Sequence, residues 1–118
     1  MPVLLTEGSY IDERVLHSIG STDEYIDFER VGDDHELEVS HVSVENRTTA
    51  YTRLVIGIRR GPDFFEREEE DAPAANDIYW TRSVFIVPEG FNLRLKLTGC
   101  TSGDEVHAFI QGCVKKVR

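Results

Sequence analysis

The chain has little of what marks secreted or membrane proteins. Among its 118 residues are two cysteines and no run of 18 apolar residues, and the first ten residues, MPVLLTEGSY, hold no basic segment followed by a long apolar one. These absences argue against a disulfide framework, a membrane-spanning helix and a secretory signal peptide. We therefore expect a protein without a membrane partner that is made and kept in a cytoplasm-like compartment.

Basic charge is also scarce. Thirteen Lys and Arg residues stand against 22 Asp and Glu residues, so the formal net charge is −9 at pH 7. A chain this acidic repels phosphate backbones, and a nucleic-acid partner is not expected. The local exception is a basic tail at residues 115–118, formed by Lys115, Lys116 and Arg118. This tail is either solvated or docks onto an acidic partner.

Motifs that carry catalysis or bind cofactors are missing. There is no Gly-x-Ser-x-Gly elbow, no phosphate-binding loop and no Gly-x-Gly-x-x-Gly segment. The nearest approach to a metal site is the pair His35 and His41, which are six residues apart, whereas a cupin pattern needs His-x-His with a nearby Glu and a later His. The segment is more simply a turn that enters a strand. We expect no enzyme activity, no metal and no cofactor.

Helical periodicity is absent as well. The charged run FEREEED could form one helical turn, but it lacks core-facing positions and lies between Pro62 and Pro73. We predict an acidic loop over residues 61–77, either solvated or a docking surface for a basic partner. The adjacent Phe64 and Phe65 would anchor this loop on its own sheet or insert into a neighbouring subunit.

What the chain does contain is alternation of apolar and polar residues with a period of two, which is typical of β-strands. A change of parity around Ser40 to Val42 indicates a bulge or a bend. We predict one all-β domain over residues 1–118, an antiparallel, jelly-roll-like β-sandwich with about seven to eight strands and no substantial helix. Residues 1–12 would form an extended N-terminal arm. The predicted strands are 13–19, 24–31, 36–45, 50–59, 78–87, 93–99 and 105–114.

The clearest pattern is PEGFNLRLKLTGCTSGDEVHAFIQG, at residues 88–112. With a turn at Ser102 and Gly103, it predicts a hairpin in which Leu97 lies opposite Ala108. Because side chains alternate across a strand, one face of this hairpin is apolar and closes the core. That face consists of Leu93, Leu95, Leu97, Val106, Ala108 and Ile110.

The same register has two further consequences. Cys100 and Cys113 would lie roughly 26 Å apart at about 3.3 Å per residue, far beyond the Cα separation of about 7 Å that a disulfide tolerates. We predict two free thiols. On the outer face, Arg94, Lys96 and Phe109 would form an interaction patch, because Phe and Arg are enriched at interfaces.

The segment WTRSVFIVPEGFNLRLKLTGCTSGDEVHAFIQG resembles the closing half of small jelly-roll proteins from tailed-bacteriophage particles. The shared elements are a Val87-Pro88-Glu89-Gly90 corner, a Gly99 to Asp104 turn and a last strand that ends near Gly112. The strand at 46–59 is also similar. The resemblance implies a virion structural protein of the head-decoration, neck or tail-accessory type, assembled in the host cytoplasm. Such proteins form homo-oligomers, dock on other virion proteins and carry no cofactor.

Three functions remain open. The leading hypothesis is a non-enzymatic structural component of a tailed-phage particle. The alternative is a ligand- or carbohydrate-binding β-sandwich module, for which exposed aromatic residues on one face, with Trp80 and Tyr79 as first candidates, would be evidence. The third is a cupin-like metalloenzyme built on His35 and His41. The candidate interface residues are Phe64, Phe65, Arg94, Lys96, Phe109, Lys115, Lys116 and Arg118.

Overall fold

The computed structural model describes residues 7–81 and 83–117. Within these residues the chain forms nine β-strands and no helix, so there is none that could cross a membrane. The strands are β1 (Gly8–His17), β2 (Asp23–Asp27), β3 (His35–Asn46), β4 (Arg53–Arg60), β5 (Asp63–Asp71), β6 (Ile78–Trp80), β7 (Phe85–Val87), β8 (Asn92–Thr98) and β9 (Glu105–Lys116).

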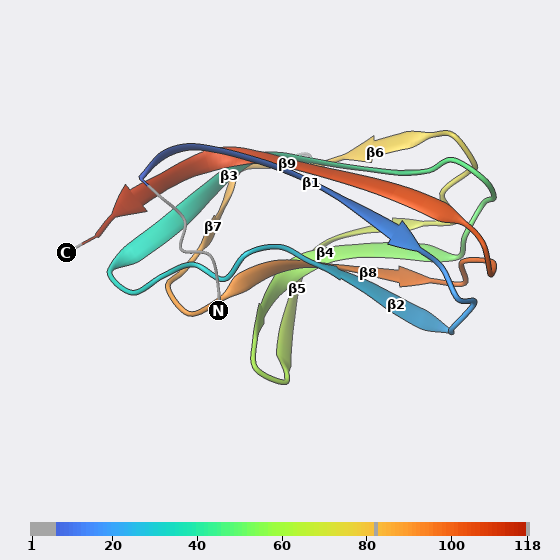
Figure 1. Ribbon diagram of the computed structural model, residues 1–118, viewed down its shortest axis with the longest axis horizontal. Coiled ribbons are helices and arrows are strands. Elements are labelled where there is room, and N and C mark those ends of the chain that lie inside the picture. Colours follow the sequence, from blue (N-terminus) through green and yellow to red (C-terminus); the bar gives the residue numbers. More distant parts are fainter. Residues whose placement is uncertain (1–6, 82, 118) are drawn as a thin grey trace.

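The strands form two antiparallel sheets that pack face to face (Figure 1). Sheet A has the order β1-β9-β3, and both β6 and β7 pair with the other edge of β3, while sheet B has the order β2-β8-β4-β5. The pairs are nested around the β4–β5 turn: β4 with β5, β3 with β6 and β7, β2 with β8, and β1 with β9. One long hairpin is thus rolled up, and the pairs β3·β9 and β4·β8 close the roll. The predicted all-β sandwich of jelly-roll type is confirmed, with nine strands.

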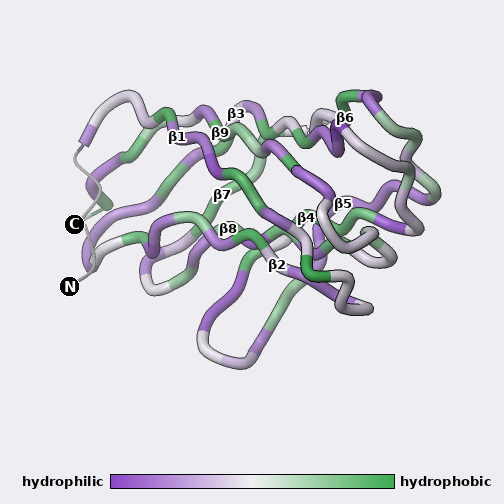
Figure 2. The backbone as a smooth tube through the Cα atoms, turned by 45° about the vertical axis from the view of Figure 1, so that its right-hand side comes forward, coloured by the Kyte–Doolittle hydropathy of each residue, from purple (hydrophilic) through white to green (hydrophobic). Residues whose placement is uncertain are grey.

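The core lies between the two sheets, and the alternation of the strands fills it. Hydrophilic and hydrophobic residues alternate along the tube in Figure 2. The apolar residues of β8 and β9 predicted to close the core, Leu93, Leu95, Leu97, Val106, Ala108 and Ile110, are all buried. The inward residues of β3 and β4 complete it, among them Leu37, Val39, Val42, Val44, Leu54, Ile56 and Ile58.

The predicted hairpin at 88–112 is wrong in its pairing. β8 belongs to sheet B, where Leu97 pairs with Glu24 and Leu54, whereas β9 belongs to sheet A, where Ala108 pairs with Arg14 and Val44. The connection at 99–104 crosses from one sheet to the other. An apolar alternation tells which side chains face the core, but two strands facing each other across a sandwich show the same alternation as two paired strands. Both cysteines are nevertheless free, as predicted.

The acidic loop predicted at 61–77 is also corrected. Its first half is strand β5, which pairs with β4 along the edge of sheet B, and the β4–β5 hairpin projects from the sandwich (Figures 1 and 2). The alternation in β5 is weak because most of its residues are charged, and charged edge strands resist pairing with other chains. Sequence periodicity misses such a strand because little of it is buried.

The two predicted ends differ from the structure as well. Strand β1 begins at Gly8, so residues 8–12 of the predicted arm are paired with β9, while residues 1–6 lie outside the described residues. Lys115 and Lys116 end strand β9 rather than forming a separate tail. Arg118 lies outside the described residues.

The predicted bulge in β3 is confirmed, because the register with β9 shifts between Val39 and His41. At this point the two backbones approach so closely that a Cβ on Gly112 would overlap the carbonyl oxygen of Glu38.

A Cβ at position 112 would have to displace backbone, which cannot move aside as a flexible side chain can. We expect Gly112→Ala to lower the free energy of unfolding by about 1–3 kcal/mol, measured by urea denaturation. Gln111→Ala, an exposed neighbour, is the control, and equal stabilities of the two variants would contradict the close approach.

Candidate binding face on sheet A

Exposed apolar side chains gather on the outer side of sheet A. Ile11 and Val15 on β1, Ile78 and Trp80 on β6, and Ile86 on β7 are exposed and occupy the outward positions of their strands. Monomeric proteins rarely expose such groups together, and clusters of them mark binding surfaces. We call the outward side chains of β1, β3, β6, β7 and β9 the sheet A face.

An aromatic row crosses the middle of this face. Trp80 on β6 is 55% exposed. Its ring centroid lies 6.4 Å from that of His41 on β3, which in turn lies 6.0 Å from that of Phe109 on β9. The bulge in β3 creates this row: Val39 and Val42 both face the core, and the extra residue turns His41 outward.

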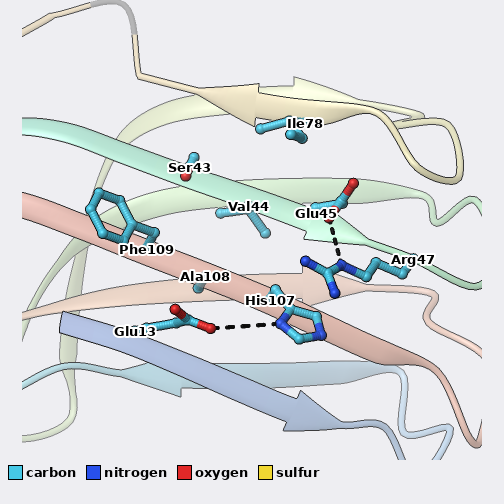
Figure 3. Close-up of a pocket in the computed structure, with 9 residues that line it drawn as sticks. All are labelled: Glu13, Ser43, Val44, Glu45, Arg47, Ile78, His107, Ala108 and Phe109. Atoms are coloured by element: carbon cyan, nitrogen blue, oxygen red, sulfur yellow. Dashed lines mark hydrogen bonds and ion pairs between the residues drawn. The ribbon is translucent and has the colours of Figure 1, made fainter.

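A shallow hollow of about 180 Å³ lies beside the row (Figure 3). Phe109 and Ile78 form apolar walls, and Ser43, whose side chain is small, lies between them. Charged groups close the other end. Glu45 accepts a hydrogen bond from Nε of Arg47 at 2.8 Å, and a carboxylate oxygen of Glu13 lies 3.9 Å from Nδ1 of His107.

The rest of the face is polar and mainly acidic. His107 also forms a short contact of 2.6 Å with Glu105 through Nε2, and Lys115 donates to Glu38 at 3.1 Å. The hydrogen bond with Glu38 raises the pKa of Lys115 above its usual value. The face therefore surrounds an apolar, aromatic centre with carboxylates and histidines that can accept or donate hydrogen bonds.

The histidines and cysteines of the described residues do not gather into a metal site. The described residues hold no group of three His, Cys, Asp or Glu residues placed to bind a metal ion. His35 lies 3.3 Å from Glu7 and His41 lies in the aromatic row, so the two do not share a site. Burial raises the pKa of Cys100 to about 11, so its thiol is protonated at neutral pH and is a weak nucleophile.

The predicted patch of Arg94, Lys96 and Phe109 is not formed. Arg94 and Lys96 face outward from sheet B, on the opposite side of the sandwich from Phe109, because β8 and β9 belong to different sheets. Arg94 is engaged within the domain: it binds Asp27 at 2.7 and 2.9 Å and lies 4.2 Å from the ring centroid of Tyr25.

The other predicted residues are dispersed. Phe65 is 44% exposed in the β4–β5 hairpin and contacts Phe91 at 6.0 Å between ring centroids, so it packs partly on its own domain, and Phe64 is half-buried. Tyr79 turns away from the sheet A face and donates its hydroxyl to Glu68 at 2.7 Å. Of the two aromatic residues proposed for ligand binding, only Trp80 lies on the face.

Sequence reasoning missed several members of the face. The sequence assigns no binding role to Glu13, Ser43, Ile78 or His107, although each occupies an outward position in a strand. The alternation of apolar and polar residues predicts that each of them points away from the core. It does not predict the order of strands in sheet A, and this order is what brings them beside Phe109.

Comparisons with known proteins show similarity in fold only. No protein-family model matches the chain, and no curated protein matches it. A solved structure described as "CBM4 structure and function" has a TM-score of 0.43 and 5% identity, covering 88% of this chain and 82% of that one. A "Crystal structure of PirA" has a TM-score of 0.47 and 12% identity, covering 86% and 93%. These similarities concern the β-sandwich arrangement alone.

Proposed function

We propose that this protein is a non-enzymatic binding module whose sheet A face holds a carbohydrate. The observation that carries the proposal is the exposed indole of Trp80, in a row with His41 and Phe109 and beside a hollow with the charged groups of Glu13 and Glu45.

A sugar ring has two kinds of surface, and this face offers a partner for each. The C–H groups on one side of a pyranose are apolar and stack on an exposed aromatic ring. An aromatic side chain offers a large contact area and loses little conformational entropy when it is fixed in a complex. The hydroxyl groups at the ring edge bond to carboxylates and to guanidinium groups such as Arg47. Strands of a packed sheet hold these groups rigidly, which reduces the cost of binding.

Trp80→Ala is the decisive variant. We expect it to weaken glycan binding by at least about 2 kcal/mol, or roughly 30-fold, because a central Trp dominates such contacts. Binding would be measured on a glycan array and by titration with the strongest hit. Tyr25→Ala, which removes an exposed aromatic from sheet B, is the matched control and should bind normally. An array without hits, or equal loss in both variants, would contradict the proposal.

A second candidate is the structural component of a tailed-phage particle that the sequence resemblance implies. The observation in its favour is the jelly-roll strand order, together with the exposed Ile11 and Val15 at the edge of sheet A. In this role the chain would form homo-oligomers and dock on other virion proteins. Co-purification with a large particle tests it, and a strictly monomeric protein without particle association would contradict it.

A further inference from the structure

The four edges of the two sheets are protected to different degrees. Strand β5 carries six acidic residues among its nine, β2 has five residues, and β6 and β7 have three each. Short or highly charged edge strands resist pairing with other chains. Strand β1 has ten residues without proline, and among the described residues it pairs only with β9 (Figure 1). It is the long edge left available.

The free side of β1 can be identified from its hydrogen bonds. The backbone N–H of Ser18 donates to the backbone oxygen of Asp104, so the even-numbered backbone groups point toward β9 and the odd-numbered ones point away from it. Among the latter, the N–H of Glu13 donates to the carboxylate of Asp12 at 2.9 Å, a bond that a new strand would replace. The inward charges of β1 are already paired, since Arg14 binds Asp12 at 2.8 Å and Glu29 at 3.0 Å. They leave no unpaired charge to oppose a new strand.

The outward side chains of β1 are complementary to themselves. In an antiparallel pair of two β1 strands with Val15 on the two-fold axis, Glu13 of each copy faces His17 of the other. Because β1 ends at His17, this pairing covers residues 13–17 of each copy. The imidazole N–H of His17 can donate to the carboxylate of Glu13, and polar and apolar cross-strand pairs of this kind stabilise a sheet.

We propose that two copies of this chain associate through β1, which joins their A sheets into one continuous sheet. The partner is a second copy because the two-fold axis sets Val15 against Val15, and the carboxylate of Glu13 against a donor of His17, as an interface between identical surfaces requires. The axis is perpendicular to the sheet, so both sheet A faces point to the same side and can bind one multivalent ligand together. The inference is independent of the carbohydrate proposal, and it names the interface for the self-association of the second candidate.

Val15→Lys tests the interface because it places two positive charges on the axis. We expect it to weaken self-association by about tenfold, measured by sedimentation equilibrium over micromolar concentrations. Val84→Lys, at an exposed position between β6 and β7, introduces the same charge away from β1 and should associate like the wild type. Far-UV circular dichroism would verify that both variants are folded.

A charge exchange tests the register. His17→Glu places two carboxylates opposite each other and should weaken the dimer, whereas the double variant Glu13→Lys/His17→Glu should restore it. A dimer that survives both Val15→Lys and His17→Glu overturns the β1 interface but leaves self-association standing. A wild-type protein that remains monomeric overturns both, while the carbohydrate proposal keeps its own test through Trp80.

Discussion

Replacing Asp104 with alanine is expected to destabilise the fold by about 3–5 kcal/mol, the largest effect of any single polar substitution that we predict. Asp104 is 1% exposed. Its Oδ2 accepts hydrogen bonds from the side chains of Asn46 at 2.9 Å and Thr49 at 2.6 Å, and from the backbone N–H of Thr101 at 2.9 Å. Alanine would leave these three donors without their acceptor.

The position of this carboxylate in the fold makes the loss global. Asp104 lies where the chain crosses from sheet B into strand β9, and its own backbone oxygen accepts a hydrogen bond from Ser18 at 2.8 Å. Asn46, which is fully buried, also accepts from the backbone N–H groups of Thr48 and Thr49. The carboxylate therefore joins the connections β3–β4 and β8–β9 at one end of the sandwich, and the backbone oxygen of the same residue holds the connection β1–β2 beside them.

The destabilisation would be measured by urea denaturation at neutral pH. Asp104→Asn is the matched variant: it keeps the size and one acceptor oxygen, so it should lose less stability than alanine. Asp63→Ala, at an exposed position of β5, should change stability by less than about 0.5 kcal/mol. An alanine variant at position 104 that is as stable as Asp63→Ala would show that the network contributes nothing.

The second large effect is a loss of stability in acid. Burial alone would raise the pKa of Asp104, but the hydrogen bonds from Thr49, Asn46 and Thr101 outweigh it and hold the pKa below its usual range. The unfolded chain then binds this proton more readily than the folded one. The stabilisation is fully present above the ordinary pKa of an aspartate, and it is lost as the pH falls through the lowered pKa of the folded state.

Asp27 adds a smaller contribution of the same sign. Burial would raise its pKa, but the hydrogen bond and charge of Arg94, with help from Arg59 and Asn92, lower it instead. Its side chain is 39% exposed, so solvent screens the ion pair and reduces its weight.

The acid effect can be assigned by comparing variants. Unfolding free energies of the wild type and of Asp104→Asn would be measured from neutral pH down to about pH 2. The wild type should lose stability more steeply, since only it carries the titrating carboxylate at this position. Parallel curves would place the acid sensitivity at other groups.

Much of the fold follows from local patterns. The alternation in β3, β4, β8 and β9 predicts the buried side chains because a sandwich buries one face of each strand, and the parity change at Ser40 to Val42 predicts the bulge. Strand β5 could not be recognised in this way, since its glutamates leave little apolar pattern. Residues 8–12 and 115–116 are strand ends that the predictions placed in an arm and a tail, because few of their side chains are buried.

The candidate site shows where local patterns stop. The alternation correctly predicts that Phe109 faces outward, but a patch with Arg94 and Lys96 would require β8 and β9 to be paired, and they belong to different sheets. Trp80 and Tyr79 are predicted alike as candidates for ligand binding, although adjacent residues of a strand point to opposite sides, and only Trp80 is exposed on the sheet A face.

The local pattern of residues is sufficient to predict an all-β sandwich with free cysteines and with a core built from alternating apolar residues. These features depend on the hydrophobic effect acting on neighbours along one strand. Which strands share a sheet is visible only in the tertiary structure. This strand order places Trp80, His41 and Phe109 on one face and β1 at an edge of sheet A. Strand order is set by packing between segments that are far apart in the chain. The alternation of side chains within a strand has a period of two whichever strand lies beside it, so it carries no information on strand order.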